Sequence, residues 1–227
     1  MPEATPTRPR QGADKRESIL DAAIRVFADK GFHGTRISDI AREAEIAYGL
    51  VYHYFKNKEE ILDSILLERW RLFLDTVRVI ADDPRHVEQK LLSIAAVILS
   101  AYRQRPEWTK VLVFEIQRSE RFAGKGRMQV VSELYDLITR ILQEAQARGE
   151  LRAELDAEIA ATVFIGSLDT IVTARVFEIG RPAGEDAATY VRLARTVVDL
   201  FLNGMGERGD RAGAGDEAGP VLGAGGA

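Results

Sequence analysis

The chain has 227 residues, 46% of them hydrophobic and none of them cysteine, so wholesale disorder, disulfide bonds and cysteine-ligated metal sites are excluded. Its length suits one large domain, or a small domain joined to a medium-sized one. The net charge is −4, but residues 1–60 contain equal numbers of basic and acidic residues, and the rest of the chain carries the whole negative charge. The N-terminal part therefore differs electrostatically from an acidic body, which does not forbid a local phosphate-binding surface.

No part of the sequence resembles a secretion signal or a membrane-spanning segment. The first residues are polar and contain several prolines. The longest apolar run, from Leu91 to Ala101, is too short to cross a bilayer and is typical of a buried helix. We therefore expect a cytoplasmic protein without a membrane partner.

The first third of the chain predicts a flexible arm over residues 1–13, followed by four helices. Apolar residues recur at helical spacing along the first helix, which Gly31 ends. Thr35 is expected to cap the second helix. Asn57 is expected to cap the fourth, with Glu60 reaching back as in a capping box. These helices are expected at about 15–30, 37–44, 47–55 and 58–80.

Five more helices are expected in the rest of the chain, and no stretch alternates long enough to predict a strand. The sequence therefore predicts an all-α protein of about nine helices. The Gly/Ala-rich residues 205–227 show no apolar period and are expected to form a disordered tail. The five helices are expected at about 85–105, 106–118, 126–148, 156–178 and 185–203.

Residues 37–55 show the pattern of a helix-turn-helix, with two short helices three or four residues apart, each with its own apolar positions. The second helix of such a motif lies in the major groove of DNA. Here it contains no Lys or Arg, and its polar side chains are Tyr48, Tyr52, His53 and Tyr54. Tyrosine hydroxyls can donate to phosphate oxygens, and tyrosine rings can touch thymine methyl groups, so the helix is suited to DNA.

The run from Ile19 to Leu62 resembles the TetR family of transcriptional repressors. The residues that carry the resemblance are Ile19-Leu20, Ala22-Ala23, Phe27, Gly31-Phe32, Thr35, Ile40-Ala41, Ala44, Gly49, Tyr52, Phe55 and Lys58-Glu59. The resemblance implies an N-terminal three-helix helix-turn-helix domain that binds DNA, followed by a helical bundle that binds a ligand and dimerises. It also implies a regulator that leaves its operator when the ligand binds.

The resemblance indicates which residues touch DNA. Tyr52, Tyr54 and Lys58 match phosphate contacts of the family, and Tyr48 and Gly49 match positions that face bases. The expected DNA-binding residues are Thr35, Arg36, Ala47, Tyr48, Gly49, Tyr52, His53, Tyr54 and Lys58. The expected partner is double-stranded operator DNA with a pseudo-palindromic sequence, read by a dimer whose recognition helices lie ~34 Å apart.

Two residues of the motif depart from the family pattern. The turn usually contains glycine, and here it contains Glu45. If that position needs a positive φ, the side chain costs about 1 kcal/mol. The recognition helix is often capped by Ser or Thr, and here Ala47 precedes it; a lost cap costs about 0.5–2 kcal/mol.

The predicted domains are a flexible arm, a DNA-binding domain, a ligand-binding and dimerisation domain, and a tail, over residues 1–13, 14–60, 61–204 and 205–227. In the family, the last two long helices form the dimer interface. Their counterparts here are residues 156–178 and 185–203, which are apolar on nearly all sides and must be buried by something besides their own bundle. A four-helix interface between two copies meets that need, so we expect a homodimer.

The candidate ligand pocket is built from aromatic and isolated polar residues of the apolar helices. They are Trp70, Phe73, Tyr102, Trp108, Phe114, Arg118, Phe164, Asp169, Thr173 and Phe177. Each aromatic residue alone fits an ordinary core as well. An unpaired acid in the apolar stretch around Asp169 is costly, and a salt bridge across the dimer explains this residue as well as a ligand does.

A closer resemblance is to the fatty-acid-degradation repressors of the FadR kind within the family. It is carried by Leu112–Glu120, Arg148-Gly149-Glu150 and Phe164–Asp169. It implies a long-chain acyl-CoA as the effector and control of genes of fatty-acid metabolism. An acyl chain needs an apolar tunnel and the CoA phosphates need arginines at its mouth, for which Arg103, Arg105, Arg118 and Arg121 are candidates.

Three other functions stay open. A multidrug-responsive repressor of an efflux pump would hold cationic ligands with buried acids, for which Glu115 and Asp169 are candidates. An all-helical enzyme is a distant alternative, because the histidines are scattered and no nucleophile–base pair or phosphate loop is evident. A helix-turn-helix adaptor that binds no DNA is the third. We expect no enzyme activity, no metal site and no cofactor.

Overall fold

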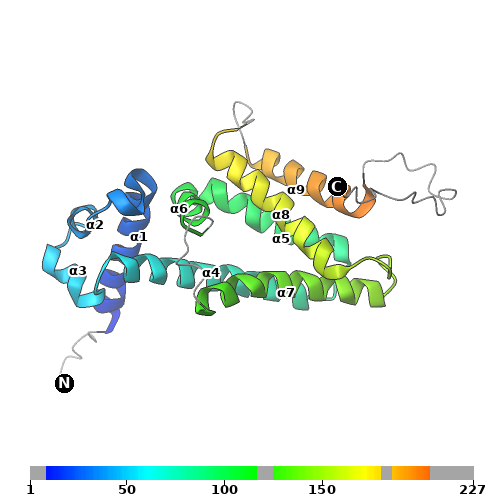
Figure 1. Cartoon of the computed structure of the whole chain (residues 1–227), viewed down its shortest axis with the longest axis horizontal. Coiled ribbons are helices and arrows are strands. Elements are labelled where there is room, and N and C mark those ends of the chain that lie inside the picture. The colour runs from blue at the N-terminus through cyan, green and yellow to red at the C-terminus, as the bar shows by residue number, and fades with distance from the viewer. Residues whose placement is uncertain (1–8, 117–124, 180–185, 205–227) are drawn as a thin grey trace, which may run out of the picture.

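In the computed structural model, the described residues 9–116, 125–179 and 186–204 form nine helices and no strand (Figure 1). The predicted all-α fold is therefore confirmed, with helix ends that differ from the predicted ones by a few residues. The helices are α1 (Pro9–Gly34), α2 (Ile37–Glu43), α3 (Tyr48–Tyr54), α4 (Lys58–Asp82), α5 (Val87–Gln104), α6 (Pro106–Ile116), α7 (Lys125–Ala147), α8 (Ala157–Val176) and α9 (Ala187–Asn203).

The first three helices pack around one hydrophobic core together with the start of α4. This N-terminal core includes Ile19 and Phe27 of α1, Ile40 of α2 and Val51 of α3, all buried. Buried residues of α4, from Ile61 to Leu66, complete it. Their spacing follows one face of each helix, as an amphipathic helix requires.

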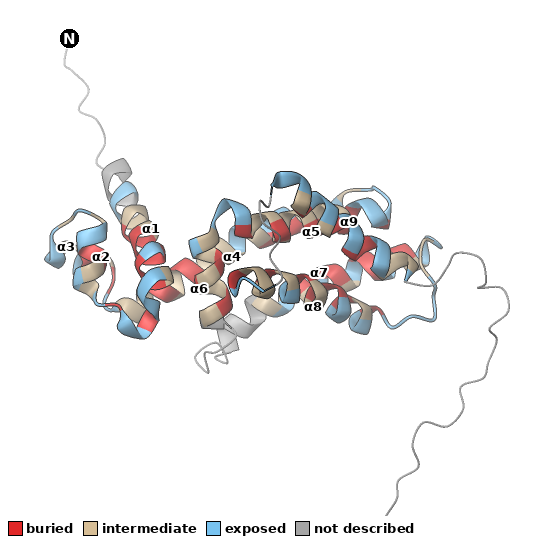
Figure 2. Cartoon of the chain, turned by 90° about the horizontal axis from the view of Figure 1, so that it is seen from above, coloured by how far each residue is buried: buried red, intermediate tan, exposed pale blue. Residues whose placement is uncertain are grey.

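The C-terminal helices form a second core. Apolar side chains of α4, α5, α7, α8 and α9 meet there, among them the fully buried Leu74, Leu91, Ile138 and Leu168. The apolar run predicted to be a buried helix lies within α5. α4 leaves the N-terminal core, runs alongside α7 and enters the second core, so one continuous helix joins the two (Figures 1 and 2).

Two expectations at the start of the chain need correction. α1 begins at Pro9, so residues 9–13, expected in the arm, are helical. Proline suits the first position of a helix, where its missing N–H leaves nothing unpaired. The N-cap of α2 is Arg36 and not Thr35. Residues 1–8 and the expected tail, 205–227, lie outside the described part.

Other predicted helix ends are confirmed by their contacts. The Asn57 side chain accepts a hydrogen bond from the backbone of Glu60 at 2.8 Å. The Glu60 carboxylate reaches back one residue further than expected, to the backbone N–H of Lys56 at 2.6 Å. The Asp156 carboxylate caps α8. α1 leaves helical geometry at Gly31, which has a φ of 69°, a conformation that glycine adopts without strain.

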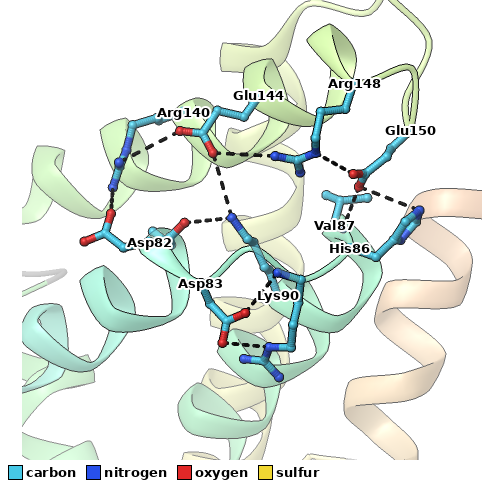
Figure 3. A network of polar contacts seen from close by, with 11 residues as sticks. Asp82, Asp83, His86, Val87, Lys90, Arg140, Glu144, Arg148 and Glu150 are labelled. Atoms are coloured by element: carbon cyan, nitrogen blue, oxygen red, sulfur yellow. Dashed lines mark hydrogen bonds and ion pairs between the residues drawn. The ribbon is translucent and has the colours of Figure 1, made fainter.

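A polar network joins the far end of α4 to α5 and α7 (Figure 3). Lys90 is 1% exposed, and its Nζ donates to the carbonyl oxygen of Ala81 at 2.7 Å. The Glu144 carboxylate lies 3.8 Å from the same nitrogen. The Glu150 carboxylate accepts from the backbone N–H of Val87 at 2.7 Å, at the start of α5. The network satisfies groups at helix ends that would otherwise be left without partners.

The length and apolar composition of α8 depart from the expectation that no part of the chain resembles a membrane-spanning segment. Over the described residues, α8 is the one helix long and apolar enough to cross a membrane, judged by length and composition alone. Only 33% of this stretch is buried inside the protein. Apolar side chains such as Ile159 and Val163 are therefore exposed, 63% and 57% respectively. An exposed apolar surface of this kind marks a place where something else binds.

Candidate nucleic-acid interface

The turn between α2 and α3 requires a positive φ at Glu45, the condition under which a side chain was expected to be costly there. Glu45 has a φ of 55°, so a non-glycine residue occupies the left-handed region there. The backbone N–H of Ile46 returns to the carbonyl of Ala41 at 3.0 Å, which closes α2 and redirects the chain into α3. Ala47 is the N-cap of α3 and makes no side-chain cap, as expected. The turn holds its shape at the cost of a strained residue and a missing cap.

α3 is a two-turn helix that divides its residues between core and solvent. Val51 is fully buried in the N-terminal core. Tyr48, Gly49, Tyr52 and His53 are exposed on the outside. Nothing lies within 4 Å of the place where a side chain on Gly49 would begin, so the backbone is open to close approach at that residue.

Tyr48 and Tyr52 form a pair on the exposed side of α3. Their hydroxyl oxygens lie 3.0 Å apart and their rings meet edge to face, with centroids 5.3 Å apart. The hydrogen bond with Tyr48 raises the pKa of Tyr52 above its ordinary value. One hydroxyl proton serves the bond within the pair, and the other is available to a phosphate or a base.

The basic residues near α3 fall into two groups. Lys30 and Arg42 both pair with Asp39, whose pKa falls to about 2 because Lys30 donates a hydrogen bond to it, with help from the backbone of Arg36. Arg36 and Lys56 are exposed, and neither has an ion pair within the described part of the chain. Phosphate contacts are therefore more accessible to Arg36 and Lys56 than to the paired residues.

Three residues of the expected DNA-binding set turn inward. Thr35 is 2% exposed, and its hydroxyl donates to the carbonyl of Gly31 at 2.8 Å. Tyr54 is half-buried against the N-terminal core. The ammonium group of Lys58 donates to backbone carbonyls at the end of α1 and in the turn that follows it. Helical spacing did not reveal these directions, because the contacts of Tyr54 and Lys58 involve distant segments and the Thr35 hydroxyl turns back to the kinked end of α1.

Most of the expected ligand-pocket aromatics share the C-terminal core. Phe164 is fully buried, and its ring lies 5.2 Å from that of Phe201. The hydroxyl of Tyr102 donates to the carbonyl of Arg175 at 3.1 Å. Three more aromatic residues are partly buried against this core: Trp70, Phe73 and Phe114. Thr173 is half-buried, and Phe177 is exposed with its ring against that of Phe114.

Two members of the expected pocket lie elsewhere. Trp108 packs against the N-terminal core, because α6 lies across α1 as well as beside the bundle. Asp169 is exposed on α8 and not enclosed in the core, because it lies on the side of the helix that faces away from the bundle. Arg118 lies outside the described residues, and so does the side chain of Glu115. The groups of three or more His, Asp or Glu that a metal needs are absent from the described residues.

The comparisons with known proteins cover both parts of the chain. A family model described as bacterial regulatory proteins of the tetR family matches residues 19–65, and one described as the C-terminal region of YsiA-like proteins matches residues 66–204. The fatty acid metabolism regulator protein of Bacillus subtilis (strain 168) is 26% identical over 196 residues, which are 86% of this chain and 98% of that protein.

Two solved structures show the same arrangement of helices. The fatty acid degradation regulator FadR from Bacillus halodurans superposes with a TM-score of 0.76 and 28% identity, over 90% of this chain and 100% of that one. FadR from Bacillus subtilis, solved in complex with stearoyl-CoA, superposes with a TM-score of 0.74 and 26% identity, over 84% of this chain and 99% of that one. The matched relatives are regulators and span nearly the whole described chain.

Proposed function

Because the chain belongs to the TetR family of bacterial regulatory proteins, we propose that it is a transcriptional repressor that leaves its operator when a long-chain acyl-CoA binds. The observation that carries the DNA-binding part is the division of α3. This helix is held to the core by Val51 and presents an uncharged surface of Tyr48, Gly49 and Tyr52 to solvent. A short helix anchored in this way fits the major groove.

The proposed contacts follow from the exposed side chains. Tyr48 and the open backbone at Gly49 face the bases, and the free proton of the tyrosine pair reaches a base or phosphate oxygen. His53 lies at the end of the same exposed surface. Arg36 and Lys56 supply the charge that α3 lacks, by contacting phosphates on either side of it.

We also propose that two copies pair through α8 and α9. The exposed apolar residues of these helices include Ile159 and Val163 on α8 and Val191 and Leu200 on α9. A second copy covers such a surface in a self-complementary way. A membrane is the poorer occupant, because Asp169 is exposed within α8 and a charged group inside a bilayer is costly. We propose that this dimer is cytoplasmic.

The effector is proposed from the relatives together with the bundle. The structure of FadR from Bacillus subtilis was solved with stearoyl-CoA, and the apolar C-terminal core of this chain has the composition that an acyl chain requires. Arg103 and Arg105 are exposed where α5 meets α6, and they suit the CoA phosphates. The multidrug alternative loses its acid Asp169, which is exposed. Binding of the effector shifts a population of conformers, and α4 carries the change between the two cores.

Native mass spectrometry with acyl-CoAs of graded chain length tests this function. Release of a duplex selected by the protein from a random pool is followed in parallel by fluorescence anisotropy. We expect a dimer that binds long-chain acyl-CoA stoichiometrically and then releases DNA. A dimer that binds DNA and ignores every acyl-CoA would reject this effector and revive the multidrug alternative. A protein that selects no duplex would reject the repressor and favour the adaptor.

A further inference from the structure

Lys58 is the first residue of α4, and its side chain points back into the protein. Its Nζ donates to the carbonyl oxygens of Phe32 at 2.7 Å and Thr35 at 3.0 Å. The carbonyl oxygen of His33 lies 3.4 Å from the same nitrogen. The ammonium also lies over the ring of Phe32, 4.5 Å from its centroid. All of these partners belong to the end of α1 and the turn before α2.

An ammonium group has three donors and no acceptor. Three carbonyl oxygens at the end of a helix can take all three, and the partial negative charge there favours a cation. The break at Gly31 leaves the carbonyls that follow it outside a regular helix, so the lysine satisfies groups that the helix itself does not. No donor of Lys58 is left for a phosphate oxygen.

We propose that Lys58 is a positioning residue that fastens the start of α4 to the turn between α1 and α2, and is not a phosphate ligand. This inference rests on the proposed DNA-binding function. Lys56, two residues earlier, is exposed, and the described residues give its side chain no ion pair. The two lysines therefore have different roles. Lys56 contacts DNA, and Lys58 fixes the position of α4 relative to the helix-turn-helix.

Other contacts strengthen the same junction. Arg16 of α1 binds the carboxylate of Glu68 of α4, with one contact at 3.0 Å, and lies over the ring of Phe55. Arg69 of α4 binds Asp21 of α1 at 2.9 Å. These pairs hold the sides of α1 and α4 together, while Lys58 holds the turn that sets the position of α2. A rotation of α4 is thereby passed to the helix-turn-helix as a whole.

The test compares the variants K58M and K56M by the dependence of DNA affinity on salt. Removing one phosphate contact per subunit lowers the slope of log affinity against log salt by about 0.9, and hence by about 1.8 for a dimer. We expect this change in K56M. In K58M we expect an unchanged slope, an affinity lowered by the same factor at every salt concentration, and a smaller release of DNA by stearoyl-CoA.

The variant K58R separates the two roles in the opposite direction. Arginine is an excellent phosphate ligand, so a phosphate contact would survive this change. The broad, planar guanidinium does not fit three carbonyls that surround one small ammonium group, so the proposed role predicts that K58R behaves like K58M. A K58M slope lowered as in K56M, or DNA binding and release by K58R equal to those of the wild type, would overturn the proposal.

Thermal unfolding of the free protein gives a reading that needs no DNA. We expect K58M to melt several degrees below the wild type, and K56M to melt at the same temperature as the wild type. Equal melting temperatures for all three proteins would overturn the internal role. Failure of both Lys58 variants to fold would support it, because a surface ligand for DNA contributes nothing to the fold of the free protein. If the wild type selects no DNA, the proposed function fails, and the melting comparison still tests the contacts of Lys58.

Discussion

At the scale of single residues, the helix-turn-helix contains a strained residue at the position where the sequence has glutamate in place of the usual glycine. Glu45 has a φ of 55°, a left-handed conformation in which a side chain approaches the backbone closely and which glycine adopts without steric strain. The turn is nonetheless closed by the bond from Ile46 to Ala41, so the surrounding contacts hold the residue in place. The strain is a cost to stability and not an obstacle to the fold.

The change E45G should therefore stabilise the free protein, by about 0.5–1 kcal/mol, because relief of the left-handed strain exceeds the added freedom of the unfolded chain. Urea unfolding followed by circular dichroism measures it. The control is Q143G, at an exposed position within α7, which should destabilise by about 1 kcal/mol because glycine weakens a helix interior. We therefore predict that replacement by glycine raises the free energy of unfolding at residue 45 and lowers it at residue 143. A loss of stability in E45G would contradict this prediction.

At the scale of elements, α4 is tied at both ends by lysine ammonium groups. Lys58 of α4 binds carbonyls of α1 and the following turn, and Lys90 of α5 binds the carbonyl of Ala81 near the end of α4. The network around Lys90 extends through Glu144 to α7 (Figure 3). The helix that joins the two cores is thus anchored to α1 and the following turn at one end and to α5 at the other.

Replacing the buried ammonium tests the far anchor. K90M keeps most of the apolar stem and removes the donor to Ala81, which leaves a buried carbonyl without its partner. We expect a loss of about 1–3 kcal/mol in the free energy of unfolding. K15M, at an exposed lysine of α1, should change it by less than about 0.5 kcal/mol. Equal stabilities of K90M and K15M in urea unfolding would show that the network adds nothing.

The helix α6 also belongs to both cores. Trp108 and Val111 pack into the N-terminal core, and Val113 lies in the C-terminal core. The ring of Phe114 meets that of Phe177 at the end of α8, with centroids 5.3 Å apart. Two helices, α4 and α6, therefore connect the bundle with the helix-turn-helix, and a rearrangement of the bundle reaches the DNA-binding part through packed side chains.

At the scale of the whole molecule, α8 and α9 carry an exposed apolar surface that we propose as the interface between two copies. The change V163D places a charge in the middle of the proposed interface between two copies, where it would be buried without a partner. We expect a monomer by analytical ultracentrifugation, and much weaker binding to a two-half-site duplex. V79D is the matched control, since Val79 is 73% exposed on α4, away from α8 and α9. A V163D protein that remains a dimer would remove this surface from the interface.

Much of the fold was predictable from residues close together in the sequence. The positions of the helices, the cap at Asn57 and the division of α3 around Val51 all follow from spacings of three or four residues. The beginning of α1 was missed because the sequence around Pro9 is polar. The apolar character of α8 was predicted, but its resemblance to a membrane-spanning helix was missed because no uninterrupted apolar run in it is long enough to span a bilayer.

By itself, the sequence determined the all-α class, the helix-turn-helix and the tyrosine-rich, uncharged side of α3 that the structure exposes, because periodicity and caps are local properties of a chain. Only the tertiary structure decided that Thr35 and Lys58 turn inward, that Trp108 belongs to the N-terminal core and that Asp169 is exposed. The places of Lys58, Trp108 and Asp169 depend on how distant segments pack, and the Thr35 hydroxyl turns back to the carbonyl of Gly31, where α1 kinks. A spacing of three or four residues says which side of a helix a residue is on, but not what that side meets.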